Sequence, residues 1–76
     1  MWTLRSYKPY KNFPSVTYFW IDSDGIVQYQ RNVSANGCMP VTMESLIGKS
    51  YKSVIGLRKV KTKATQEQLQ KGILVL

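Results

Sequence analysis

The chain contains no histidine, and this absence bears first on catalysis and metal binding. Histidine is the commonest general acid–base residue and the commonest metal ligand in proteins. A single cysteine, Cys38, cannot form a zinc site, and without an adjacent base it is a weak nucleophile. We interpret Cys38 as a partly buried loop thiol. The sequence therefore predicts a protein that is not an enzyme, has no catalytic residues and binds no metal or other cofactor.

Acidic residues are also scarce, with four Asp and Glu against eleven Lys and Arg and a formal net charge of +7. Asp22 and Asp24 flank a turn, which explains them better than a role in acid–base chemistry. Such an excess of positive charge indicates a polyanionic partner, such as nucleic acid or an acidic protein surface. The alternative is a basic surface that serves only solubility.

The sequence has no long apolar run of the kind that spans a bilayer, and its N-terminal residues lack the apolar core of a signal peptide. Small secreted domains usually need several cysteines for disulfides, whereas this chain has one. We therefore expect a soluble cytoplasmic protein that does not contact membranes. With 76 residues, the chain is expected to form one domain, residues 1–76.

The stretch "YFWIDSDGIVQYQ", residues 18–30, predicts a β-hairpin. Residues 15–22 are rich in β-branched and aromatic side chains, and residues 26–33 form the returning strand. Asp24-Gly25 lies between the two runs, and Asp-Gly in such a place is the strongest short-range signal for a hairpin. This hairpin is the centre of the predicted fold.

The length of the hairpin turn decides which of its aromatic side chains are exposed. In a two-residue turn, Trp20 lies opposite Tyr29 and both face the core, which leaves Phe19 exposed on the other face. In a three-residue turn that begins at Ser23, the pairing slips by one residue, and Trp20 and Tyr18 face outward. We favour the two-residue turn because it gives the domain one nearly unbroken apolar face.

Apolar residues at helical spacing after Thr42 predict the main helix of the fold. Thr42 is a suitable N-cap, and Gly56 stands where glycine commonly follows the end of a helix. Gly48 costs such a helix about 1 kcal/mol relative to alanine, so an earlier end at Ile47 is an alternative. The apolar positions of this helix are Leu46, Ile47, Tyr51, Val54 and Ile55.

Three further strands and a short helix complete the predicted order of elements. Residues 2–7 read as a first strand, residues 57–63 as an edge strand rich in lysine, and residues 73–76 as a last strand. A capping box predicts a short helix that begins at Thr65 and ends by Lys71. The expected class is α+β: a small single domain with an antiparallel curved sheet built on the central β-hairpin and one main helix packed on one face. The apolar ending also makes a homodimer a reasonable expectation.

The cations are concentrated in two segments that contain no acidic residue. Six of them fall within the fifteen residues 49–63, and three more fall within residues 5–11. On a strand, Lys59, Lys61 and Lys63 would project from one face at intervals of about 6.6 Å. Such a row of charges suits the phosphates of an extended nucleic-acid backbone, because each neutralised phosphate releases counterions.

An aromatic ring on a sheet beside a basic surface is a common device for binding single strands. In the favoured hairpin register, Phe19 is that ring, and the amides of Gln28 and Gln30 lie beside it to contact base edges. The predicted nucleic-acid-binding residues are Lys8, Lys11, Phe19, Gln28, Gln30, Arg31, Lys49, Lys52, Arg58, Lys59, Lys61 and Lys63.

Two functional hypotheses follow from these patterns. The first is a small basic non-enzymatic protein that binds RNA or single-stranded DNA, because no long basic helix is available to enter a major groove. The alternative is a small protein-binding inhibitor or adaptor, comparable to phage accessory proteins, that covers an acidic surface of a partner such as a nucleic-acid enzyme. If the two basic segments meet beside an exposed ring in the folded domain, nucleic acid is favoured. If they scatter, the inhibitor is favoured.

Overall fold

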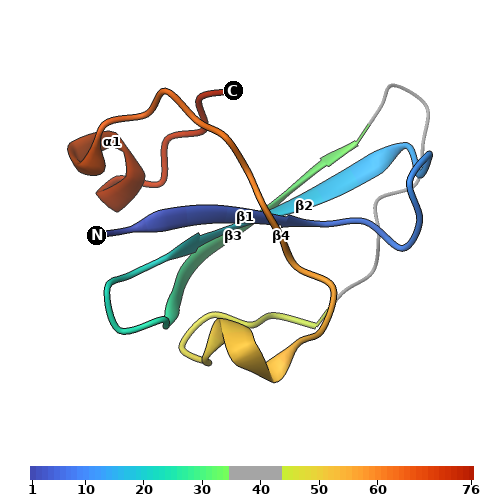
Figure 1. Cartoon of the computed structure of the whole chain (residues 1–76), viewed down its shortest axis with the longest axis horizontal. Coiled ribbons are helices and arrows are strands. Elements are labelled where there is room, and N and C mark those ends of the chain that lie inside the picture. The colour runs from blue at the N-terminus through green and yellow to red at the C-terminus, as the bar shows by residue number, and fades with distance from the viewer. Residues whose placement is uncertain (35–43) are drawn as a thin grey trace.

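The protein folds as a four-stranded antiparallel sheet with one short α-helix, in a computed structural model that describes residues 1–34 and 44–76 (Figure 1). The strand order is β3-β2-β1-β4, so β2 and β1 are central and β3 and β4 are edges. This arrangement confirms the expected α+β class. The elements are β1 (Thr3–Tyr7), β2 (Ser15–Ile21), β3 (Val27–Ser34), a 3₁₀ helix (Tyr51–Ser53), β4 (Arg58–Lys59) and α1 (Gln66–Gln70).

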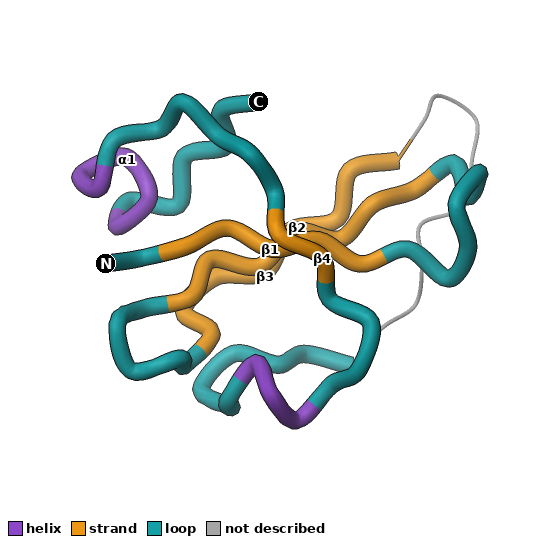
Figure 2. Tube along the Cα trace, viewed as in Figure 1, coloured by secondary structure: helices purple, strands orange, loops and turns teal. Residues whose placement is uncertain are grey.

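The sheet is covered on both faces, and β2 is the strand around which both halves of the core form. The helix α1 and the C-terminal segment lie over one face, and residues 44–57 lie over the other (Figure 2). The chain that contains β4 crosses from one layer to the other (Figure 1). One half-core consists of Leu4, Tyr18, Trp20 and Leu69, and the other consists of Phe19, Ile21, Val27 and Leu46.

The hairpin combines the two registers that the sequence allowed. Trp20 pairs with Tyr29, as in the favoured register, whereas Ile21 pairs with Val27, as in the slipped one. An irregularity between Trp20 and Ile21 joins the two. Trp20 is therefore buried as we expected, whereas Tyr29, which we also expected in the core, is 40% exposed. The expectation that Phe19 is exposed is wrong, because residues 44–57 cover the face of the sheet that it occupies and leave it 0% exposed.

The hairpin turn itself contains three residues, not the two that we favoured. The backbone N–H of Asp22 donates to the carbonyl of Ile26 over 3.0 Å, and that of Gly25 donates to the carbonyl of Asp22 over 3.1 Å. Gly25 has a φ of 81°, in the left-handed region that glycine occupies without strain. The glycine of the Asp-Gly signal thus serves as the last residue of a longer loop.

The predicted main helix is wrong for the part of it that the structure describes. Gly48 has a φ of 85°, and the Lys49 N–H donates to the Leu46 carbonyl over 2.9 Å, which forms a turn instead of a helix. The backbone then pairs with the hairpin: the Val27 N–H donates to the Lys49 carbonyl over 3.0 Å, and the Gly48 N–H donates to the Val27 carbonyl over 2.8 Å. At Gly48, the residue that disfavours an α-helix, the backbone forms hydrogen bonds with the edge strand β3 in place of those within a helix. The expected N-cap Thr42, like Cys38, lies outside the described residues.

The predicted edge strand is shorter than expected, and the predicted C-terminal strand does not form. The edge strand comprises only β4, after which the Val60 N–H donates to the Leu4 carbonyl over 3.1 Å and the chain leaves the sheet. The Trp20 indole N–H donates to the Ile73 carbonyl over 3.2 Å, and Leu74 packs against the half-core around Trp20. The apolar ending is therefore partly used within the chain itself.

The short C-terminal helix α1 begins with the capping box that the sequence predicted. Thr65 Oγ1 accepts a hydrogen bond from the Gln68 N–H over 3.2 Å, and Gln68 Oε1 accepts one from the Thr65 N–H over 3.0 Å. Leu69 faces the core, and Gly72 follows the helix with a φ of 72°. No helix within residues 1–34 and 44–76 has the length and apolar character needed to cross a membrane.

Candidate functional site

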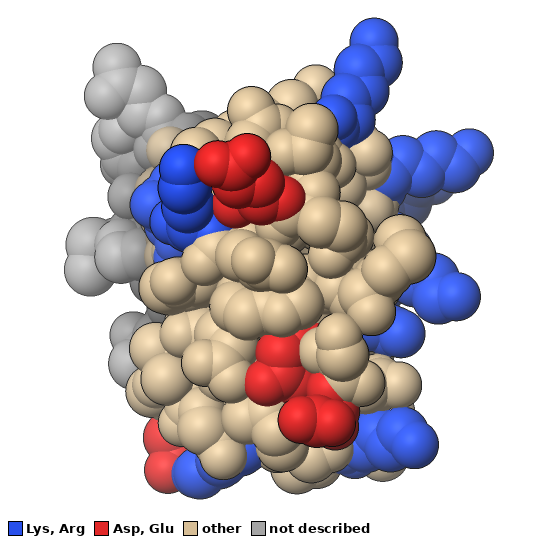
Figure 3. Space-filling model, turned by 90° about the vertical axis from the view of Figure 1, so that its left-hand side faces the viewer, with Lys and Arg blue, Asp and Glu red and all other residues tan. Residues whose placement is uncertain are grey.

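Strand pairing brings the two basic segments of the sequence together at one edge of the sheet. Arg5 of β1 pairs with Lys59 of β4, and Ser6 pairs with Arg58. Figure 3 shows many Lys and Arg side chains projecting along one side of the molecule. Beyond β4, Lys61 and Lys63 are exposed, while Thr62 between them is half-buried. We call this surface the basic edge: Arg5, Lys8, Lys11, Arg58, Lys59, Lys61 and Lys63.

The basic edge contains a hollow of about 600 Å³ at the end of β1. Lys8, Lys11 and Arg58 line it, together with Tyr10. The ring of Tyr10 is 61% exposed, and its centroid lies 5.1 Å from that of Phe13 in an edge-to-face contact. The Phe13 N–H also donates to the Tyr10 carbonyl over 3.1 Å, so a tight turn supports the ring. This cation hollow therefore presents three positive charges beside an exposed, supported aromatic ring.

The acidic residues of the described chain form no ion pair with a cation of the basic edge. Glu44 pairs with Lys49 at 3.5 Å, and Glu67 pairs with Lys71 at 3.0 Å. Across the part of the chain that the structure describes, these are the two ion pairs, and neither includes a cation of the basic edge. The basic edge therefore presents its positive charge without internal neutralisation.

Asp22 is committed to the hairpin turn. Its Oδ1 accepts hydrogen bonds from the N–H groups of Ile26 and Asp24, both over 2.9 Å, and its Oδ2 accepts one from the Gln28 amide over 2.7 Å. These bonds, first among them that from Ile26, hold the pKa of Asp22 below its ordinary value of 3.8, because they stabilise the charged carboxylate. The carboxylate therefore fixes the turn.

Arg5 is the most constrained cation of the basic edge. Its guanidinium carbon lies 4.4 Å from the centroid of the Tyr51 ring, which places positive charge over the negative face of the ring. Its Nε is buried and has no hydrogen-bond partner among the described residues. The ring contact therefore positions Arg5 without cancelling its charge.

Three of the predicted contact residues serve the fold. Phe19 is in the core, and the amide of Gln28 is bound to Asp22. Gln30 Oε1 accepts a hydrogen bond from the Leu46 N–H over 2.7 Å, and its Nε2 donates to the Glu44 carbonyl over 3.4 Å. The two glutamines thus stabilise the hairpin turn and the segment that covers the sheet. The sequence had predicted that they contact base edges.

The remaining predicted cations lie apart from the cation hollow. Arg31 is on β3, at the opposite edge of the sheet, with its guanidinium carbon 5.4 Å from the centroid of the Trp20 ring. Lys49 is paired with Glu44, and Lys52 is exposed on the 3₁₀ helix. Of the predicted set, the structure brings Lys8, Lys11 and Arg58 together around one hollow, and Lys59 follows Arg58 in β4. The expected row of Lys59, Lys61 and Lys63 on one strand is wrong, because β4 ends at Lys59.

Sequence reasoning missed Tyr10, the exposed ring of the cation hollow. Prolines and an asparagine surround it, which is typical of a loop. The available signal was its place between Lys8 and Lys11, two cations in a loop that also carries Phe13. An aromatic residue flanked by lysines in a loop is compatible with an exposed ring beside positive charge.

Comparison of the chain with protein-family models, curated proteins and solved structures gives no match.

Proposed function

We propose that the protein binds single-stranded nucleic acid, RNA or DNA, along the basic edge, and that it does so without catalysis. The observation that carries this proposal is the meeting of Lys8, Lys11 and Arg58 around one hollow beside the exposed ring of Tyr10. Cations that track a backbone and rings that stack on bases are the two parts of a sequence-tolerant single-strand site.

A single strand suits this surface better than a duplex. The bases of a single strand are free to stack on Tyr10, whereas those of a duplex are already stacked. Reading a duplex through its major groove requires a helix or a two-stranded ribbon that enters it. The α-helix that the structure describes has five residues, from Gln66 to Gln70, and carries no Lys or Arg. The proposal includes a cytoplasmic location, because small secreted domains generally rely on disulfides.

A second candidate, an inhibitor or adaptor that covers an acidic protein surface, is favoured by Ile55. This side chain is 96% exposed and lines the cation hollow. An exposed aliphatic residue beside cations suits an interface with a protein that is acidic and partly apolar. It adds less to the binding of a phosphate backbone.

Fluorescence anisotropy with a labelled twelve-nucleotide single strand tests the first proposal. We expect affinity to fall linearly with the logarithm of the salt concentration, because binding releases counterions. A duplex of the same sequence should bind more weakly than the single strand. The absence of binding at low salt, or an affinity indifferent to salt, would overturn the proposal. Equal affinity for a polyglutamate chain would favour the acidic-protein candidate.

A further inference from the structure

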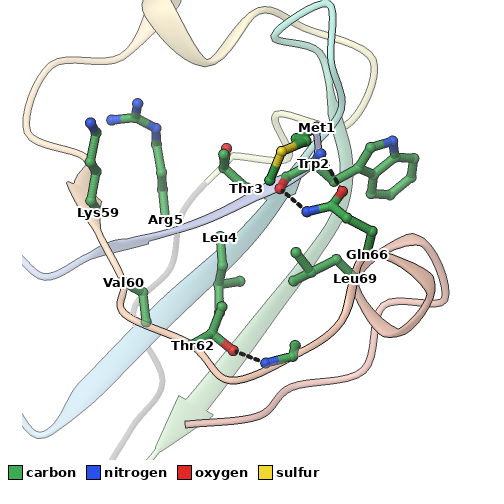
Figure 4. Close-up of a pocket in the computed structure, with 11 residues that line it drawn as sticks. Met1, Trp2, Thr3, Leu4, Arg5, Lys59, Val60, Thr62, Gln66 and Leu69 are labelled. Atoms are coloured by element: carbon green, nitrogen blue, oxygen red, sulfur yellow. Dashed lines mark hydrogen bonds between the residues drawn. The ribbon is translucent and has the colours of Figure 1, made fainter.

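A second hollow lies at the other end of the β1–β4 pair and differs in chemistry from the cation hollow. It measures about 350 Å³, at the lower end of the range for small-molecule sites. Leu4, Val60 and Leu69 line it and come from β1, the segment after β4 and α1 (Figure 4). Arg5 and Lys59 lie close together at one side (Figure 4). We call it the apolar hollow.

The hydrogen-bonding groups of Gln66 and Thr62 in the apolar hollow are already engaged. Gln66 Oε1 accepts a hydrogen bond from the Trp2 N–H over 2.7 Å, and its Nε2 donates to the Trp2 carbonyl over 3.0 Å. Thr62 Oγ1 accepts one from the Ala64 N–H over 3.0 Å and donates to the Val75 carbonyl. Apart from the exposed Thr3, the side chains that an occupant would meet are apolar or already hydrogen-bonded, and its negative charge would lie near Arg5 and Lys59.

We infer that the apolar hollow receives one base of the bound single strand, while Arg5 and Lys59 bind its phosphate. This inference rests on the proposed function and adds a base site to it. Charge complementarity supports this occupant, because a nucleotide joins a planar ring with apolar faces to an anion in one unit. The pairing of Ser6 with Arg58, which line the cation hollow, continues directly into the pairing of Arg5 with Lys59, which line the apolar hollow. One strand can therefore reach both hollows along β1.

The hydrogen bonds of Gln66 and Thr62 also predict how the base is selected. Strong discrimination between bases requires protein groups that are free to hydrogen-bond to base edges. Since Gln66 and Thr62 are engaged within the protein, the apolar hollow selects for a flat ring and not for a particular sequence. We expect affinities for thymidine and adenosine homopolymers to differ by less than about tenfold, because stacking is sequence-tolerant.

NMR of protein with labelled methyl groups tests the inference directly. The probes are a thymidine hexanucleotide and an abasic hexamer with the same number of phosphates. We expect the methyl signals of Leu4, Val60 and Leu69 to shift with the first strand and to stay in place with the second. The Tyr10 ring is followed in the same titration through labelled tyrosine side chains. If the methyl signals stay in place with both strands, or shift equally with both, while the Tyr10 ring signals respond, the base site is refuted and the proposed function stands. No response at any residue at low salt would refute both.

A variant that fills the apolar hollow gives a second readout. Ala64 lines the hollow and is half-buried, so Ala64→Leu reduces the space for a base. We expect it to weaken binding of the thymidine hexanucleotide about tenfold and to leave the abasic strand unaffected. Gln70→Leu is the matched control, because it adds a leucine at an exposed position of α1 outside the hollow. Equal binding by both variants would contradict the inference, and if Ala64→Leu does not fold, the NMR titration decides.

Discussion

The guanidinium carbon of Arg5 lies 4.4 Å from the centroid of the Tyr51 ring, so a cation of β1 is held by an aromatic residue of the 3₁₀ helix. Such a contact contributes about 0.5–1 kcal/mol at exposed sites and about 2 kcal/mol when desolvated. Tyr51→Leu should therefore lower the free energy of unfolding by at least about 1 kcal/mol, since packing is lost as well. Tyr51→Phe, which keeps the ring face, should retain most of the stability. Urea denaturation measures both, and equal losses would contradict a role for the ring face.

Removing cations of the cation hollow should change the salt dependence of binding. The double variant Lys8→Ala with Lys11→Ala is expected to reduce the slope of log affinity against log salt by about 1.4, at about 0.7 per single-strand phosphate contact. The matched control is Lys49→Ala with Lys71→Ala, because these lysines pair with Glu44 and Glu67 and lie outside the hollow. If anisotropy titrations show that the slope of log affinity against log salt falls by the same amount in both double variants, net charge governs binding and the basic edge does not.

Tyr10 should matter for binding and little for stability. Its ring is 61% exposed, and exposed substitutions generally change the free energy of unfolding by less than about 0.5 kcal/mol. Stacking of a base on an aromatic ring is worth about 1–3 kcal/mol. Tyr10→Ala is therefore expected to weaken single-strand binding by a factor of about 5 to 150, measured by anisotropy. Unchanged affinity would remove Tyr10 from the site.

Phe19 should show the opposite behaviour. It is 0% exposed, and replacing a buried phenylalanine by alanine costs about 3–5 kcal/mol. Denaturant unfolding of Phe19→Ala should show a loss of this size, which is a large share of the stability expected for so small a domain. In the fraction that remains folded, affinity for single strands should be unchanged. A stable Phe19→Ala protein with weaker binding would contradict its place in the core.

Acid should weaken the hairpin turn through Asp22. The pKa of this carboxyl is lowered in the folded protein, so its contribution to stability is fully present above the ordinary value of 3.8. That contribution is lost as the pH falls from the ordinary value through the lower folded value. Asp22→Asn should therefore unfold with a weaker pH dependence than the wild type between pH 6 and acid. Asp24→Asn is the control, because its carboxylate makes no hydrogen bond within the described residues.

The fold was predictable from the sequence where local signals and burial agreed. The Asp-Gly signal located the hairpin, and the capping box located α1. The alternative registers were both partly right, because a three-residue turn and an irregularity at Trp20 compensate each other. No local pattern distinguishes that combination from either simple register. The register is decided by packing against the two covering layers: Trp20 lies in one half-core, and Ile21 and Val27 lie in the other.

The prediction of a main helix was wrong because its apolar residues can also reach the core from a turn and a 3₁₀ helix. Leu46, Tyr51 and Val54 do pack against one half-core, but from a turn and a 3₁₀ helix that follow the sheet. Gly48 makes the turn available, and the open edge beside Val27 supplies hydrogen bonds that a helix would otherwise have made. The candidate site was also only partly predictable from the sequence. The cations were identifiable by charge, whereas the position of Tyr10 beside Arg58 depends on the pairing of β1 with β4.

The burial of β2 on both faces has a consequence for how the chain acquires its structure. Successive side chains of this strand enter opposite half-cores, so neither half-core can persist after β2 has left the sheet. Thermal or denaturant unfolding is therefore expected to be a single cooperative transition. The partners of β2 come from near both ends of the chain, since Leu4 and Leu69 share one half-core. Loops must close over most of the chain before these contacts form, so folding is expected to be slow for a protein of this size.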